Sequence, residues 1–147
     1  MNEKVMTALE HSDTEAMLTA LVTALGDALP CERCGLFLRN PDNGLSKLTH
    51  LWNSRDDHPL SRADEWLPES PTLAKDDPMF GEALVNPIAL YINDITKESA
   101  DVLNATFEIE NFGHTALIHA PIHFQGQMYG ILEPCVFDKP RVWSDDN

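Results

Sequence analysis

The alternation of apolar and polar positions is most regular near the end of the chain, in residues 112–143. Apolar side chains occupy residues 116, 118, 120, 122 and 124, and polar ones occupy residues 115, 119, 123 and 125. A period of two is typical of an antiparallel strand with one apolar face and one polar face. Gln125 and Gly126 supply a reversal, and residues 128–137 return as a second, more apolar strand. This segment therefore predicts a β-hairpin.

A helix is predicted ahead of the first strand, over residues 13–29. It opens on the capping-box sequence Ser12 to Glu15, continues with apolar residues at near-helical spacing, and ends at Pro30. Its apolar stripe needs a partner, which is either the sheet or the same helix of another copy. A homodimer formed through this helix is therefore one candidate assembly.

The middle of the chain predicts a hairpin over residues 34–53, with a turn at Pro41 to Gly44. Residues 54–78 are rich in proline and charge and predict a long irregular loop, a kind of segment that is usually functional or disordered. A short helix over 78–85, a strand over 88–93 and a helix over 96–111 follow, with Thr96 as the expected N-cap. The order predicts an α+β fold with a largely antiparallel sheet and helices on its faces.

Composition places the chain among soluble single-domain proteins, with 147 residues of which 43% are hydrophobic and 23% charged. Ten basic residues against 24 acidic ones give a formal charge of −14, which disfavours binding to nucleic acid or to anionic membranes. No apolar run approaches the roughly 20 residues that cross a bilayer, and the N-terminus does not resemble a secretory signal. Three cysteines cannot all pair, so a cytoplasmic location is expected.

Four segments together resemble the GAF domain, and the likeness covers roughly residues 14–145. They are CERCGLFLRNPDNG (31–44), LTHLWNS (48–54), LYINDI (90–95) and ILEPCVFDKPRVW (131–143). The chain is most similar to cyanobacterial GAF domains related to phytochromes and cyanobacteriochromes. The resemblance implies a central antiparallel sheet of five or six strands, helices on its faces, and a ligand pocket built from residues 55–112. It also implies a sensory or regulatory role in signal transduction.

Photoreceptor members of this family attach a linear tetrapyrrole to a cysteine, and the resemblance places that position at or near Asn104. No cysteine occurs between residues 35 and 134, so the usual thioether has no thiolate to form from. Covalent bilin attachment is therefore disfavoured, and the cofactor is left open, with a non-covalent small molecule as the candidate. The family commonly continues beyond the Arg141 to Trp143 segment into a long helix, so a single domain over 1–147 with a missing or truncated terminal helix is expected.

Several residues are candidates for contact with a ligand. The aromatic side chains suit a flat organic molecule, and the histidines can donate to an anionic or carbonyl-bearing one. Each also has a structural alternative, namely core packing for an aromatic, helix entry for an aspartate and a structural hydrogen bond for a histidine. His119 and His123 lie about 13 Å apart along a regular strand, too far to share a metal ion. The candidates are Trp52, Trp66, Tyr91, Asp94, Phe107, His114 and His119.

Motifs of nucleophilic or metal-dependent catalysis, such as GxSxG, the P-loop or HExxH, do not occur. The acidic residues of the loop, Asp77 among them, are expected to be solvated, and no paired acid and base stands out. Cys31 and Cys34 have the spacing of half a zinc site, but Cys34 opens an apolar run and is expected in the core. A non-enzymatic sensory domain is the leading hypothesis. The alternatives are a ligand-free dimerisation module and an enzyme similar to the free methionine sulfoxide reductases, which use cysteines in the loops around the pocket.

Overall fold

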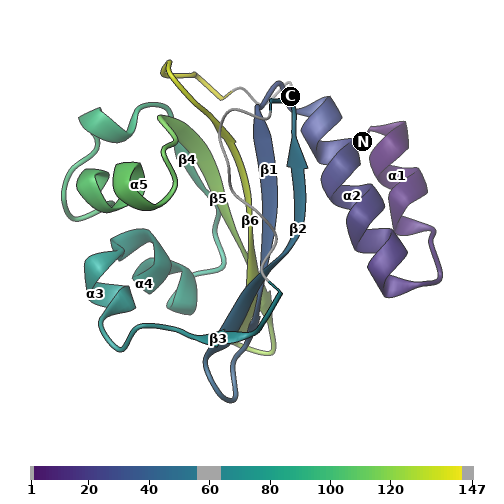
Figure 1. The fold of residues 1–147 in the computed structure, drawn as a ribbon, viewed down its shortest axis with the longest axis horizontal. Helices are drawn as coiled ribbons and strands as arrows, with labels where there is room; N and C mark the ends of the chain where they lie inside the picture. Colours follow the sequence, from purple (N-terminus) through teal and green to yellow (C-terminus); the bar gives the residue numbers. More distant parts are fainter. Residues whose placement is uncertain (1, 56–63, 144–147) are drawn as a thin grey trace.

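A computed structural model describes residues 2–55 and 64–143. They form one antiparallel sheet with helices on both of its faces (Figure 1). The strands lie in the order β3-β2-β1-β6-β5-β4, and every neighbouring pair is antiparallel. The strands are β1 (Arg33–Asn40), β2 (Leu45–Asn53), β3 (Leu67–Pro68), β4 (Leu90–Ile92), β5 (Ala116–Phe124) and β6 (Gln127–Val136). The helices are α1 (Glu3–Leu9), α2 (Thr14–Ala28), α3 (Leu73–Asp76), α4 (Pro78–Val85), the 3-10 turn η1 (Ile95–Lys97) and α5 (Ala105–Asn111). The predicted α+β fold with an antiparallel sheet is confirmed.

The centre of the sheet joins the two hairpins that the sequence predicted. Strand β1 pairs with β6, so that Arg33 lies opposite Cys135 and Leu38 lies opposite Gly130. The turn between β5 and β6 has φ of 52° at Gln125 and 80° at Gly126, and two positive φ values suit a tight two-residue hairpin. The hairpin at the end of the chain is therefore confirmed.

Helix α2 covers one face of the sheet, and α1 lies along the outer side of α2 (Figure 1). The carboxylate of Asp13 caps α2 by accepting a hydrogen bond from the Ala16 N–H at 3.0 Å. Val22 of α2 packs with Leu36 in the core beneath the helix, and Trp52 packs beside them. The sheet itself is thus a partner of the apolar stripe on residues 13–29.

Helices α3, α4 and α5 lie on the opposite face of the sheet (Figure 1). Met79, Leu103 and Leu117 pack in a second core there, and Met128 packs with Ala83 of α4 in a third. All three helices are short, at four, eight and seven residues. Along the described residues, no helix combines the length and the apolar character needed to cross a membrane.

The helix predicted over residues 96–111 is wrong in its first half. Two side chains explain the break, because each one caps a separate short element. Asp94 accepts from the Thr96 N–H at the start of η1, and Asn104 accepts from the Phe107 N–H at the start of α5. The predicted loop over 54–78 is also more ordered than expected, since it contains β3 and α3; its residues 56–63 lie outside the described part.

Candidate functional site: a polar cavity between the sheet and the short helices

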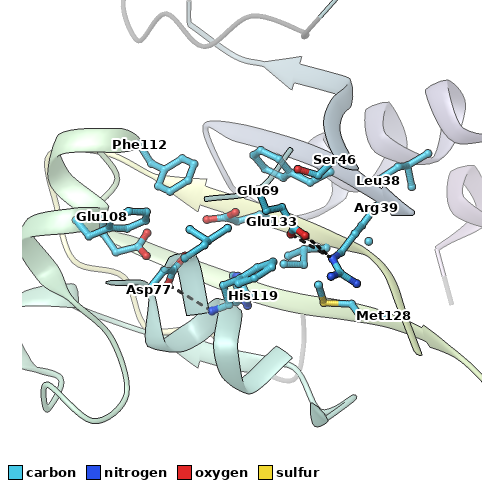
Figure 2. A pocket seen from close by; sticks show the side chains of 16 residues that line it. Leu38, Arg39, Ser46, Glu69, Asp77, Glu108, Phe112, His119, Met128 and Glu133 are labelled. Atoms are coloured by element: carbon cyan, nitrogen blue, oxygen red, sulfur yellow. Dashed lines mark hydrogen bonds and ion pairs between the residues drawn. The ribbon is translucent and has the colours of Figure 1, made fainter. Parts of the chain in front are cut away.

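A cavity of about 200 Å³ lies between the sheet and α3–α5 (Figure 2). Strands β1 and β6 form most of its floor, through residues such as Phe37 and Ile131. The helices cover it with Leu73, Phe80 and Phe107. Its walls are therefore mainly apolar and aromatic, which is typical of pockets for small organic molecules.

An ion pair lies at one end of the cavity. Arg39 of β1 donates from Nε to both carboxylate oxygens of Glu69, at 2.9 and 3.1 Å. Figure 2 shows Arg39 at this end and Glu108 at the other. The two side chains are only 18% and 11% exposed, so solvent screens the pair weakly. The contact ties β1 to the segment between β3 and α3.

The other end of the cavity carries a buried cluster of acids around one histidine. The Nε2 atom of His114 lies 2.6 Å from Oε2 of Glu108, and its Nδ1 atom lies 3.5 Å from Oε1 of Glu133. The carboxyl group of Asp77 lies beside Glu108. His114 is fully buried, and its ring stacks on Phe112 with 5.4 Å between the ring centres.

Two atoms of this cluster lack a hydrogen-bond partner within the described part of the chain. They are Oε1 of Glu108 and Nδ1 of His114, in side chains that are 1% and 0% exposed. A buried polar atom without a partner costs about 1–3 kcal/mol, so such atoms concentrate at functional sites. The cluster at this end, the closed end of the cavity, therefore contains two buried polar atoms that no described protein group satisfies.

Burial dominates the electrostatics of the cluster. It raises the pKa of Asp77, Glu108 and Glu133 to about 7 each, and the neighbouring Glu108 raises that of Asp77 further. Burial also lowers the pKa of His114, and it lowers the pKa of His119 to about 4, with His114 as a second cause. The carboxyl groups consequently change charge close to neutral pH, where an entering cation would favour their ionised forms.

One cation already lies beside the cluster. Arg33 is 4% exposed, donates to the Phe112 carbonyl at 3.2 Å, and places its guanidinium 4.8 Å from the centre of the Phe137 ring. Its charge acts on both His114 and Glu133. A single guanidinium balances only one of the three neighbouring carboxyl groups when all are ionised.

Three of the seven candidate residues lie at this site. Phe107 and His119 line the cavity, and His114 bridges Glu108 and Glu133, which also line it. The remaining four lie elsewhere.

Trp52 packs against Gly26 of α2, on the opposite face of the sheet. Trp66 and Tyr91 are 44% and 61% exposed and do not line the cavity. Asp94 accepts hydrogen bonds from the backbone and the hydroxyl of Thr96, so its side chain is used to start η1. Trp52 and Asp94 match their structural alternatives, core packing and helix entry, whereas Trp66 and Tyr91 are exposed rather than packed in the core.

The sequence did not predict the buried acids of the cluster. Asp77 was expected to be solvated, but it is only 7% exposed, because it caps the first turn of α4 and lies beside Glu108 of α5. Glu108 looked like one of many acids on its helix, although it is 1% exposed. A signal for Glu133 was present, since it is the single charged residue in the apolar run 130–137. The expectation that no acid and base are paired in a perturbed environment is therefore wrong.

The cysteines are placed away from the cavity. All three are free and buried, and none lines the cavity. Burial raises the pKa of Cys31 to about 11 and that of Cys34 to about 12, so both are neutral thiols at physiological pH. Cys34 lies in the core beneath α2, as its apolar neighbours predicted.

A six-stranded antiparallel sheet with helices on both faces and a cavity over one of them is found in the GAF fold. Residues 13–147 match the profile of the GAF domain family, and the chain belongs to that family. No curated protein sequence matches the chain significantly.

Solved GAF domains share the fold at low sequence identity. The GAF domain of a phosphoenolpyruvate-protein phosphotransferase from Acinetobacter is 15% identical, with a TM-score of 0.68 over 97% of this chain and 77% of that one. The blue-light absorbing form of the PixJ GAF domain from Thermosynechococcus elongatus is 18% identical, with a TM-score of 0.68 over 99% and 79%. The phycocyanobilin-bound GAF domain of a cyanobacterial phytochrome is 19% identical, with a TM-score of 0.67 over 91% and 75%. Similarity at this level establishes the common fold.

Proposed function

We propose that this GAF domain is a non-enzymatic sensory or regulatory module that binds a small molecule in the cavity over the sheet. The observation that carries the proposal is the combination of an apolar cavity with buried polar atoms at its closed end that have no protein partner. Membership of the GAF family supports a sensory role, and the phytochrome domain with bound phycocyanobilin illustrates ligand binding on this fold.

The size and lining of the cavity restrict the ligand. A volume of about 200 Å³ is below the roughly 300–1,000 Å³ of typical ligand pockets, so it favours a molecule much smaller than a linear tetrapyrrole. Phe80 and Phe107 suit an apolar or aromatic body, while Glu133 and His119 offer polar contacts on the floor. A compact molecule with one polar end fits this division.

A cavity-filling variant tests the proposal. Leu73 of α3 lines the cavity and is half-buried, whereas Lys75 on the same helix is exposed, so Leu73→Trp and Lys75→Trp form a matched pair. The wild-type domain is screened by thermal shift against small metabolites, with a chelator present throughout to remove metal ions. A ligand at about 100 times its Kd stabilises the native state by about 2.7 kcal/mol. We expect this shift to be lost in Leu73→Trp and kept in Lys75→Trp.

Native mass spectrometry of the three proteins, with the hits added, gives an independent readout. A bound mass that is present in the wild type and Lys75→Trp but lost in Leu73→Trp would place the ligand in the cavity. A hit that Leu73→Trp binds equally well, or a screen without hits, would refute ligand binding in this cavity.

A further inference from the structure

The buried cluster brings together oxygen and nitrogen atoms that could serve as ligands of a metal ion. One carboxylate oxygen from each of Glu108 and Glu133 and one ring nitrogen of His114 lie within 4.8 Å of one another. All three side chains are buried. They come from α5, from β6 and from the segment between α5 and β5, so the fold converges on this point from separate elements.

The contact between Glu108 and His114 determines which ring nitrogen is available. An ionised carboxylate only accepts hydrogen bonds, so when Glu108 is ionised the 2.6 Å contact has His114 donating from Nε2. In a neutral imidazole, Nδ1 then carries the lone pair. This Nδ1 atom is the one without a hydrogen-bond partner. Metal-binding histidines commonly have this arrangement, in which the far N–H is held by a carboxylate.

The distance on the other side of the ring suits a metal ion better than a hydrogen bond. Nδ1 of His114 and Oε1 of Glu133 are 3.5 Å apart, which is too long for a good N–H···O bond. Nitrogen and oxygen ligands at about 2.0–2.2 Å from a tetrahedral ion lie roughly 3.4 Å from each other. The two atoms are therefore already spaced as neighbours in one coordination sphere.

Rigidity and charge point the same way. The ring of His114 stacks on Phe112 at an interplanar angle of 12°, so the direction of its nitrogen atoms is fixed before any ion arrives. Three carboxyl side chains, those of Asp77, Glu108 and Glu133, gather here around one neighbouring guanidinium, that of Arg33. Such an acidic environment favours a cation.

We propose that His114 Nδ1 and Glu133 bind one divalent transition-metal ion at the closed end of the cavity, with Glu108 as the positioning residue. The imidazole ligand favours ions such as Zn²⁺, Fe²⁺ or Ni²⁺ over Mg²⁺ and Ca²⁺. Because Glu133 also lines the cavity, the remaining coordination positions face it. Water or a small oxygen- or nitrogen-bearing ligand fills them.

Metal titration of the wild-type protein gives the primary test. After dialysis against a chelator, Co²⁺, Mn²⁺ and Zn²⁺ are added separately at pH 7.5, with calorimetry for stoichiometry and visible absorption for Co²⁺. We expect one ion per chain, a Co²⁺ absorption band and a rise in Tm. The affinity should fall as the pH is lowered, because protons compete for the ligands. The absence of a stoichiometric site in the folded wild type would overturn the proposal without any variant.

Variants separate the two ligands from the positioning residue. His114→Gln and Glu133→Gln should weaken binding more than 100-fold, since each removes a direct ligand. Glu108→Gln should weaken it about 10- to 100-fold, the usual effect of removing such an outer partner. At saturating Co²⁺, Glu108→Gln should still give the wild-type spectrum, which a loss of a direct ligand would change.

Exposed residues of the same types provide the controls. Glu110→Gln on the same helix and His11→Gln on the surface should leave binding unchanged. Circular dichroism and thermal unfolding show which variants are folded, and a variant that fails to fold leaves the wild-type titration and Glu108→Gln as the deciding measurements. Binding that survives His114→Gln and Glu133→Gln, or that His11→Gln abolishes, would identify an adventitious surface site and overturn the proposal. Because the ligand screen above contains a chelator, its failure and the failure of metal binding are distinguishable.

Discussion

The two faces of the sheet differ in what they bury. Beneath α2 the core is mainly apolar, with Val22, Leu36 and Trp143 packed together, and its buried His50 pairs with Glu15 of the helix. Beneath α3–α5 the protein buries an acidic cluster, with Glu108, His114 and their neighbours, beside the cavity. The face with the long helix holds a packed core, and the face with the short helices holds the cavity and the buried acids.

The energetics of the two faces follow from this difference. A fully buried aliphatic side chain contributes about 1.5–3 kcal/mol, and the α2 face collects several of them. On the cavity face, each buried polar atom without a partner costs about 1–3 kcal/mol. Helices of four to eight residues add little stability of their own. A face covered by such short helices needs less free energy for local unfolding than the rest of the domain, which is a common property of binding sites.

The largest expected difference concerns truncation of a leucine on each face. Leu36 is 2% exposed in the core beneath α2, so Leu36→Ala should lower the free energy of unfolding by about 3 kcal/mol. Leu73 is half-buried beside an existing cavity, so Leu73→Ala should cost less than about 1 kcal/mol. Urea denaturation measures both values. Equal costs would show that the two faces contribute alike to stability.

A smaller effect is expected at Gly26, where α2 meets the sheet. A Cβ atom at this position would overlap the indole ring of Trp52, so the helix approaches the sheet only because residue 26 is a glycine. Gly26→Ala gains about 1 kcal/mol of helix propensity, but overpacking of a tight contact costs about 1–3 kcal/mol. We expect a net loss of about 1 kcal/mol in chemical denaturation.

Thr19→Ala, on the exposed side of the same helix, is the matched control for Gly26→Ala. It gains helix propensity without meeting the sheet, so it should be neutral or stabilising by a few tenths of a kcal/mol. If Gly26→Ala were stabilising, Trp52 would have to move at little cost to make room for the added Cβ atom. The α2 face would then be less tightly packed than the comparison of the two faces assumes.

The elements that the sequence predicted correctly are those with strong local signals. Helix α2 starts within the predicted capping sequence, although Asp13 rather than Ser12 caps it, and it ends before Pro30. The hairpin of β5 and β6 combines alternation with a Gly126 turn. The helix predicted over 96–111 failed because Asp94 and Asn104 cap two separate elements, and a cap inside an apolar run resembles an ordinary polar position.

The site could be predicted only in part, because its residues meet through tertiary structure. Asp77, Glu108 and Glu133 are separated by at least 25 residues along the chain, and no local pattern brings them together. His114 and His119 were chosen for their chemistry alone, and both are buried at the site. Trp52 shows the opposite problem, since alternation places a side chain on a face of the sheet without telling which helices cover that face.

The cysteines report on each face separately, since Cys34 lies beneath α2 and Cys135 lies in the core of the other face. Burial raises the pKa of Cys31 from 9.0 to about 11, which lowers its thiolate fraction at pH 8 by about 100-fold, and Cys34 is affected more strongly. Because thiolates are the reactive form, native labelling by iodoacetamide should be slow for all three and should proceed through local or global opening.

Peptide-level mass spectrometry of the labelled protein then ranks the two faces by their opening free energies. We expect Cys135 to label before Cys34, because the short helices of the cavity face open more readily than α2. Leu36→Ala should accelerate labelling of Cys34 and narrow the gap, since it removes packing beneath α2. If Cys34 were labelled first in the wild type, the order of the opening free energies would be the reverse of the one expected. The α2 face would then open more readily than the face that holds the cavity and the buried acids.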